Sequence, residues 1–312
     1  MKILVTGGAG FIGSWVAEGF INLGHNVVIV DNLSSGLESN IPRGAKFYPM
    51  DINAPEIERV FAEEKFDIVD HHAAQVDLLK SIDNPEKDIE SNLLGTLRLL
   101  EHSVKYGVKK FIFASSGGAI YNEILGLPST EELEYFPPSP YGINKLAAEK
   151  YIQYFHRMHG LGYIVLRYSN VYGPRQGLSA ESGVVSIFTQ RMLSNQAISI
   201  YGDGNQTRDF LYVEDAVRAN IMALNSEIVG VFNISTNKQT SIKELFSYLK
   251  ALTGYSGFPE YTEGRVGEVK HSWLSNEKAK QVLNFEPIFD LKTGLKRTIE
   301  YYRSRVSSAK NR

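Results

Sequence analysis

MKILVTGGAGFIGS, residues 1–14, contains the signals that decide the fold. Residues 3–5 form a short apolar run, which is typical of a buried strand, and residues 11–23 carry the apolar spacing of a helix. Gly7, Gly10 and Gly13 lie between them in the spacing G-x-x-G-x-x-G. Glycine lets the backbone turn tightly and approach a pyrophosphate, which then rests on the N–H groups and the positive end of the helix dipole. The stretch therefore predicts a strand, a phosphate-binding loop and a helix.

An acidic residue follows the second apolar run, at the position that a dinucleotide site requires. Residues 27–30 predict a second strand, and Asp31 comes directly after it. A carboxylate there accepts hydrogen bonds from the 2′ and 3′ hydroxyls of an adenosine ribose. Residues 32–36 contain no arginine that would neutralise a 2′-phosphate, so we expect NAD rather than NADP. The structural alternative for Asp31 is a turn residue that ends a strand.

The alternation of strand and helix continues through the first half of the chain. Apolar runs rich in Val, Ile and Phe predict further buried parallel strands at residues 66–69, 110–114 and 163–167. Helical patterns lie between the strands at residues 55–64, 85–106 and 140–159. Strand and helix in alternation predict the α/β class and a Rossmann-like, doubly wound parallel sheet with helices on both faces.

The pattern becomes less regular after about residue 170. We expect residues 1–170 to form an NAD-binding Rossmann domain. Residues 171–312 are expected to form mainly a smaller substrate-binding lobe, in which some segments can return to the first domain. Helices are predicted there at residues 184–193 and 241–252, and short strands at residues 198–201 and 231–234. The polar, basic tail at residues 304–312 predicts a frayed terminus.

Composition and charge limit the partners of the protein. The 312 residues carry 33 Lys and Arg against 35 Asp and Glu, a net charge of −2, so no global basic field would hold nucleic acid or an anionic membrane. The absence of cysteine excludes disulfides, thiolate metal sites and cysteine nucleophiles. No apolar run reaches the length of about 20 residues that spans a bilayer. We expect a cytoplasmic protein without a metal site.

A tyrosine and a lysine lie one turn apart at the beginning of a predicted helix. Tyr141 and Lys145 stand at i and i+4 and share one face. A tyrosine with its ordinary pKa of about 10 is a poor base at neutral pH. A nearby ammonium and a positive nicotinamide favour the phenolate, so Tyr141 can take a hydroxyl proton while hydride leaves for NAD⁺. Ser115 and Ser116, at the end of the predicted strand 110–114, are candidates to share that proton.

The chain resembles the extended short-chain dehydrogenase/reductases that act on nucleotide sugars, and among them most closely the UDP-glucose (UDP-galactose) 4-epimerases. The resemblance covers almost the whole chain. It rests on TGGAGFIGS at 6–14, DNLSSG at 31–36, HHAAQ at 71–75, SSGGAIY at 115–121, SPYGINK at 139–145, RYSNVYGPRQ at 167–176 and YGDGNQTRDFLYVEDA at 201–216.

The resemblance implies a set of residues for each part of the site. The catalytic residues would be Tyr141, Lys145 and Ser116. The residues that contact NAD would be Gly7, Gly10, Phe11, Ile12, Gly13, Asp31, Asn32, Gly36, Asp51, Ile52, Ala73, Ala74, Asn92, Tyr141, Lys145 and Tyr168. The residues that contact the UDP-sugar would be Ser116, Asn170, Val185, Tyr201, Arg208, Arg265 and Glu268. The resemblance also implies a homodimer, in which the helices predicted at 85–106 and 140–159 pair into a four-helix bundle.

One position departs from the family pattern, because the catalytic hydroxyl usually stands four residues before the tyrosine of the strand-end motif. Counted back from Tyr121, that position is Gly117, and Ser116 lies one residue earlier. We assign the role to Ser116, and the alternative is a strand-terminal serine bonded to backbone. The resemblance implies the NAD-dependent inversion of C4 of a UDP-hexose through a transient 4-keto sugar.

Three other functions stay open. A UDP-glucuronate 4-epimerase must hold a carboxylate, which the Arg175 guanidinium could reach. A nucleotide-sugar 4,6-dehydratase needs an acid and a base directly after the catalytic hydroxyl, where this chain has Gly117 and Gly118. A dinucleotide-sensing protein without catalysis would have little use for Tyr141 and Lys145.

Overall fold

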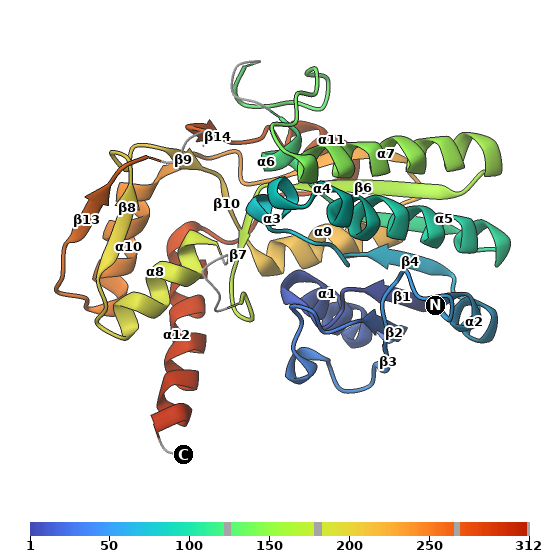
Figure 1. Ribbon diagram of the computed structural model, residues 1–312, viewed down its shortest axis with the longest axis horizontal. Coiled ribbons are helices and arrows are strands. Elements are labelled where there is room, and N and C mark those ends of the chain that lie inside the picture. The colour runs from blue at the N-terminus through green and yellow to red at the C-terminus, as the bar shows by residue number, and fades with distance from the viewer. Residues whose placement is uncertain (122–125, 178–182, 265–268, 311–312) are drawn as a thin grey trace.

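A parallel sheet of seven strands, in the order β11-β6-β5-β4-β1-β2-β3, forms the centre of the computed structural model (Figure 1). Its strands are β1 (Lys2–Thr6), β2 (Asn26–Asp31), β3 (Lys46–Pro49), β4 (Ile68–His71), β5 (Lys110–Ser116), β6 (Gly162–Tyr168) and β11 (Gly230–Ile234). The structure describes residues 1–121, 126–177, 183–264 and 269–310. This arrangement confirms the predicted doubly wound parallel sheet.

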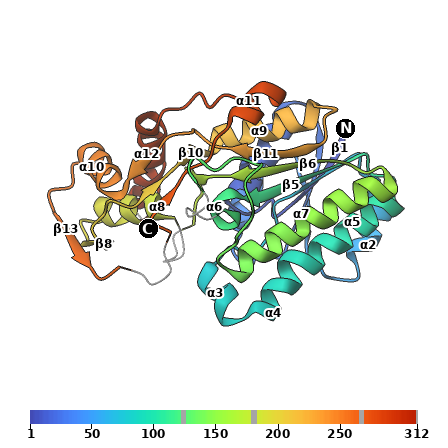
Figure 2. The ribbon, with the colours of Figure 1, turned by 90° about the horizontal axis from the view of Figure 1, so that it is seen from above.

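Helices cover both faces of the sheet, which explains why its strands are apolar runs rather than alternating ones (Figure 2). One face is packed by α1 (Phe11–Asn22), α9 (Val213–Asn225) and α11 (Glu277–Leu283). The other is packed by α2 (Ile57–Glu64), α5 (Gly95–Lys105) and α7 (Pro140–His159). Side chains of neighbouring strand positions therefore enter two separate cores.

The strand order reverses at β1. The chain runs from β1 to β2 and β3 in one direction, and from β4 to β5 and β6 in the other. Ligands of open α/β sheets bind outside the carboxyl ends of the strands at such a switch point. The loop after β1 and the loop after β4 meet there, since a Cβ atom on Gly7 would lie 2.6 Å from the Ala73 nitrogen. The site is therefore expected at this edge.

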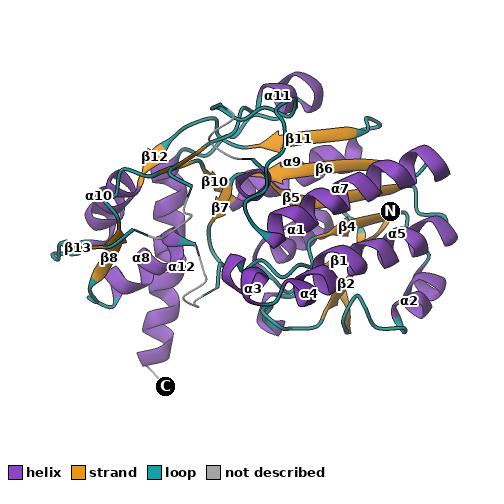
Figure 3. Ribbon diagram, turned by 45° about the horizontal axis from the view of Figure 1, so that its top comes forward, coloured by secondary structure: helices purple, strands orange, loops and turns teal. Residues whose placement is uncertain are grey.

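The second half of the chain builds a smaller group of elements around a third core (Figure 3). Its helices are α8 (Val184–Leu193), α10 (Ile242–Thr253) and α12 (Leu291–Lys310). Its short strands are β7 (Asn170–Tyr172), β8 (Ile198–Tyr201), β9 (Thr207–Arg208), β10 (Phe210–Tyr212), β12 (Thr240–Ser241), β13 (Pro259–Thr262) and β14 (His271–Ser272). β11 does not stay with this group, because it pairs with β6 at the edge of the central sheet, with Ile234 opposite Tyr168.

Two predictions about elements were wrong. The helix predicted at residues 85–106 is divided into α4 (Pro85–Asp88), the π-helical segment η2 (Ile89–Leu94) and α5. The tail does not fray from residue 304, since α12 continues to Lys310. The remaining short elements are η1 (Glu38–Asn40), α3 (Leu78–Asp83) and α6 (Gly117–Ile120). Within the described ranges, none of the helices combines the length and the apolar character that crossing a membrane requires.

Candidate active site

The glycines of the loop between β1 and α1 leave its backbone N–H groups accessible to an anion. Gly7 has a φ of +68°, and its nitrogen donates to the Val30 carbonyl at 2.9 Å. A Cβ atom on Gly13 would lie 2.3 Å from the Gly7 oxygen, so only glycine lets the helix begin this close to the loop. Gly10 caps α1 without a side-chain bond, and the first turn has no acidic residue. The first-turn N–H groups and the helix dipole therefore suit a pyrophosphate.

Asp31 ties the end of β2 to this loop. One carboxylate oxygen accepts from the Ala9 nitrogen at 3.0 Å and the other from the Leu33 nitrogen at 2.8 Å. Each oxygen keeps lone-pair capacity for a further donor, as binding of two ribose hydroxyls requires. Beyond Asp31, the Asn32 side chain donates to Asp51 at 2.7 Å. The residues present thus fit the adenosine half of NAD.

The loop after β4 completes the predicted cofactor side. The Ala73 nitrogen donates to the Thr6 hydroxyl at 3.2 Å, which fixes the loop beside the glycines. Asn92 is buried, and its amide exchanges two hydrogen bonds of 2.9 Å with the Gln75 backbone. Asn92 therefore acts on this loop as a scaffold. Ala74 lies on the same loop and is half-buried.

Tyr168 directs its side chain away from the catalytic helix. Its ring lies in the core that α1 and α9 form, and its hydroxyl accepts from the Asn220 amide at 2.7 Å. Burial, with Asp70 nearby, raises the pKa of Tyr168 well above its usual value. Any contact of Tyr168 with the nicotinamide would have to come from its backbone, and that contact stays a prediction.

Helix α7 brings Tyr141 and Lys145 to the carboxyl end of β5. Pro140 occupies the first turn, and the Ser139 hydroxyl accepts from the Gly142 nitrogen at 3.2 Å, so the helix begins at a fixed point. Both side chains are buried. The Lys145 ammonium donates to the Ala114 carbonyl at 3.0 Å and lies 6.0 Å from the centre of the Tyr141 ring.

The electrostatics of this pair are set mainly by burial. Burial raises the pKa of Tyr141 well above its usual value, the charge of Asp88 raises it further, and the nearby Ser116 hydroxyl lowers it. Burial lowers the pKa of Lys145 to about 8, against the opposing charges of Asp88 and Glu149. Burial thus favours the neutral form of both groups, and a positive nicotinamide nearby would favour the phenolate of Tyr141.

The two serines at the end of β5 have different partners. Ser115 is buried and donates to Glu149 at 2.6 Å. Ser116 is half-buried and lies close enough to Tyr141 that its hydroxyl lowers the pKa of that phenol. A hydroxyl already committed to a buried carboxylate is poorly placed to meet a substrate. These contacts support Ser116 over Ser115 as the hydroxyl that shares the substrate proton.

A buried ion pair joins α7, which carries Tyr141 and Lys145, to strand β6. This pair was not predicted from the sequence. Arg167 and Glu149 are both fully buried, with 2.5 Å between the nitrogen and the oxygen. Arg167 also donates to the Tyr121 hydroxyl at 2.5 Å, which in turn donates to Asn233 at 3.0 Å. A charged Arg inside an apolar strand and a Glu one turn after Lys145 were the available signals.

A second network joins the smaller group of elements to the sheet. Asp209 is fully buried, and its carboxylate accepts from the Thr236 nitrogen at 3.0 Å and the Thr236 hydroxyl at 2.6 Å. Burial raises the pKa of Asp209 to about 6, while these hydrogen bonds lower it. The Asn170 nitrogen donates to the Asp209 carbonyl at 2.9 Å. The structure thus places Asn170 and Arg208, two of the predicted diphosphate contacts, on adjoining segments.

The other predicted substrate contacts are less well placed or not described. Val185 is buried in the third core, whereas Tyr201 is exposed at the end of β8. Arg265 and Glu268 lie outside the described residues. The guanidinium of Arg175 is paired with Glu18 and lies 4.4 Å from the Trp15 ring centre, so α1 already holds it.

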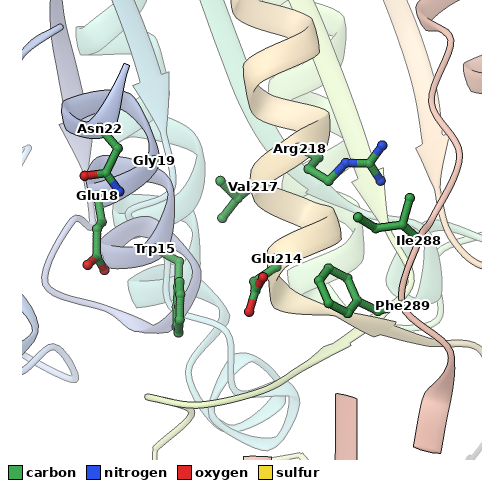
Figure 4. Close-up of a pocket in the computed structure, with 9 residues that line it drawn as sticks. All are labelled: Trp15, Glu18, Gly19, Asn22, Glu214, Val217, Arg218, Ile288 and Phe289. Carbon is green, nitrogen blue, oxygen red and sulfur yellow. The ribbon is translucent and has the colours of Figure 1, made fainter. Parts of the chain in front are cut away.

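Figure 4 shows a pocket between α1 and α9 that contains none of the predicted site residues. Trp15 and Val217 face it from the two helices, and Phe289 closes it from the segment before α12.

The structure adds buried charged residues to the site residues that the sequence suggested. These are Asp88, Glu149, Arg167 and Asp209.

Comparison with known proteins identifies the family. The model of the NAD dependent epimerase/dehydratase family matches residues 3–235. The chain belongs to this family. A similar relative within it is the putative UDP-glucose 4-epimerase of Methanocaldococcus jannaschii, 45% identical over 97% of this chain and 98% of that protein.

Solved structures of the epimerase family agree in fold over nearly the whole chain. The UDP-glucose 4-epimerase of Thermotoga maritima, crystallised with UDP-glucose, superposes with a TM-score of 0.96 and 48% identity, over 98% of this chain and 100% of that chain. The UDP-glucose 4-epimerase of Thermus thermophilus, in complex with NAD, gives a TM-score of 0.91 and 37% identity, over 97% and 99%.

Proposed function

We propose that this protein is an NAD-dependent isomerase that interconverts UDP-glucose and UDP-galactose by inverting C4 of the hexose. The observation that carries the proposal is the group at the carboxyl end of β5. Tyr141 and Lys145 lie buried one turn apart, and the Ser116 hydroxyl acts on Tyr141 by lowering its pKa. The similarity to UDP-glucose 4-epimerases over nearly the full length of the chain supports the same activity.

The residues divide the chemistry as follows. NAD, held by the glycine loop and Asp31, would supply the acceptor and donor of the hydride at C4. Tyr141 takes the proton of the C4 hydroxyl, which leaves a 4-keto sugar. It gives a proton back after the keto sugar has rotated to present its other face. Lys145 stabilises the phenolate by its charge, and Ser116 passes the proton between sugar and tyrosine. Because cofactor and acid–base group return to their first state, no added reductant is consumed.

The cofactor fits the residues that would hold it. Gly7, Gly10 and Gly13 leave the space and the N–H groups that a pyrophosphate needs, and Asp31 offers the acceptor that the ribose needs. Phe11 and Ile12 belong to the same helix start, and Gly36 lies against Ala9, where a Cβ atom would come within 2.9 Å. We assign the pyrophosphate and adenosine contacts to these residues.

The rival reactions receive less support. A 4,6-dehydratase needs proton-transferring side chains after Ser116, but Gly117 and Gly118 follow it. A Cβ atom on Gly117 would lie 2.4 Å from the Leu274 side chain, so a side chain at that position would require Leu274 to move. A UDP-glucuronate 4-epimerase would use Arg175 for the carboxylate, whereas Arg175 is paired with Glu18. A sensor would not need the buried Tyr141–Lys145 pair.

We assign cofactor binding to residues 1–170 and sugar-nucleotide binding mainly to residues 171–312, with β11 returning to the central sheet. The separate third core around α8, α10 and α12 supports this division. Asn170, Val185, Tyr201, Arg208, Arg265 and Glu268 are the residues to which we assign the UDP part of the substrate.

A homodimer is proposed from the exposed face of α7. Ile143, Tyr151, Tyr154 and Met158 are apolar or aromatic side chains that this helix leaves exposed, and Leu94 is exposed beside it. α5 and α7 lie side by side on the same face of the sheet (Figure 2). A second copy of the chain would cover these side chains. Light scattering after gel filtration would give the mass of the assembly and so test the dimer.

We place the protein in the cytoplasm. The absence of cysteine is compatible with that reducing compartment.

One experiment separates the candidate functions. The purified protein is incubated without added NADH with UDP-glucose, UDP-galactose, their N-acetyl forms and UDP-glucuronate in separate tubes, and products are identified by NMR. Interconversion of UDP-glucose and UDP-galactose is expected. Turnover of UDP-glucuronate alone, loss of water, or no turnover of any sugar would each contradict the proposal and point to one of the three alternatives.

A further inference from the structure

Asp88 is a buried carboxylate that stands beside the catalytic pair without belonging to it. Its exposed fraction is 1%, and it ends the short helix α4 directly before the π-helical segment η2. One carboxylate oxygen accepts from Asn92 at 2.8 Å and from Gln75 at 3.0 Å. The other accepts from Asn144 at 2.7 Å. Three separate segments therefore meet at this one carboxylate.

All three partners of Asp88 are neutral amides that donate. A carboxylate accepts only, so it satisfies three donors at once, whereas an asparagine would present its own N–H groups to at least one of them. In the part of the chain that the structure describes, no Lys, Arg or His lies within ion-pair distance of Asp88. Its negative charge is thus buried without a direct counter-ion, and its field extends to nearby groups.

The amide partners connect Asp88 to both sides of the proposed active site. Asn144 stands between Tyr141 and Lys145 on α7, so its bond to Asp88 fixes the rotation of that helix turn. Asn92 holds the loop after β4 through the Gln75 backbone. A π-helical segment such as η2, which carries Asn92, is often found at functional sites.

The charged surroundings of the pair are few. Asp88 faces Tyr141, and both Asp88 and Glu149 face Lys145, but the charge of Glu149 is compensated by Arg167. His71 faces Lys145 from β4, and burial lowers the pKa of His71 well below its usual value, so it is neutral. Among the described residues, Asp88 is therefore the charge without an ion-pair partner that acts on both catalytic groups.

We propose that Asp88 is a positioning residue of the isomerisation: it fixes Asn144 between Tyr141 and Lys145 and holds the proton on the buried Lys145 ammonium. The inference rests on the proposed function only in that Tyr141 and Lys145 are the catalytic pair. A buried negative charge favours an ammonium and disfavours a phenolate. Removing it lowers the pKa of both groups.

The test uses Asp88→Asn, with Glu86→Gln as the matched control, because Glu86 is an exposed acid on the same short helix. With NAD bound, the positive nicotinamide would favour the phenolate, so the pH profile of kcat is expected to have an acidic limb, where Tyr141 must lose its proton, and a basic limb, where Lys145 must keep its own. In Asp88→Asn both limbs are expected to move to lower pH by about one unit, the size of shift that one nearby charge produces. Glu86→Gln leaves both limbs in place. A slower enzyme with unmoved limbs in Asp88→Asn would overturn the proposal.

A titration independent of activity separates this inference from the proposed function. With lysines carrying ¹³C at the ε carbon, the Lys145 signal is identified by its loss in Lys145→Arg. It is expected to titrate near pH 8 in the natural chain and lower in Asp88→Asn. If the protein turns over no UDP-sugar but this shift appears, the proposed function fails and the action of Asp88 on Lys145 stands. An unchanged titration overturns it.

A second variant covers the case in which Asp88→Asn does not fold. Asn144→Ala removes the link to α7 and keeps the charge of Asp88. Its kcat is expected to fall by about tenfold, the size of one lost hydrogen bond to a charged group, with both limbs in place. Unchanged kcat in Asn144→Ala contradicts the positioning role.

Discussion

The buried pair of Arg167 and Glu149 offers the sharpest test of how the catalytic helix is supported. Both side chains have no exposed surface, and Arg167 donates to the two carboxylate oxygens at 3.0 and 2.5 Å. Replacing Arg167 by Met leaves Glu149 as a buried charge whose one remaining donor, among the residues that the structure describes, is the Ser115 hydroxyl. Losing one partner of such a pair costs about 3–5 kcal/mol of unfolding free energy, because the remaining ion has lost both its water and its counter-charge.

The assay is a double-mutant cycle in urea. Arg167→Met and Glu149→Leu are each expected to lower the unfolding free energy by about 3–5 kcal/mol. The double variant has no buried charge left, so it should lose much less than the sum, and the coupling should reach about 2–3 kcal/mol. Single variants that lose under about 1 kcal/mol, or losses that add, would refute the argument.

Three further outcomes follow from the site. Tyr141→Phe lowers kcat at least about a hundredfold and leaves NAD bound, as measured by turnover and by the cofactor absorbance of the purified protein; unchanged turnover contradicts the assignment. Ser116→Ala slows turnover more than Ser115→Ala does, because Ser115 is committed to Glu149, and the reverse order would move the role to Ser115. Gly13→Ala places a methyl group 2.3 Å from the Gly7 oxygen, so calorimetry should show weakened NAD binding, and an unaltered affinity would refute the glycine argument.

The sequence predicted the fold where the physical signal is local. Apolar runs and glycine spacing mark β1 and β2, and α7 begins and ends at the predicted residues. β11 was predicted as a strand, but its place beside β6 depends on contacts between residues far apart in the chain. The π-helical break at η2 has no local signal, because its residues are compatible with a regular helix.

The same limit applies to the site. The catalytic tyrosine and lysine are separated by one helical turn, so the sequence alone places them on one face. Asp88 lies far from α7 in the sequence, and only the structure shows its contact with Asn144. The pairing of Arg175 with Glu18 also could not be predicted from the sequence, and it engages the guanidinium on which the uronate alternative depended.

In the proposed reaction, one hydrogen leaves C4 and returns to it within a single site. The most direct measurement uses UDP-galactose with deuterium at C4, incubated with the protein in ordinary water and followed by NMR. The UDP-glucose formed is expected to keep its deuterium at C4, because the hydride is held inside the site until it returns. Deuterium lost to the solvent, or no UDP-glucose formed, would contradict it.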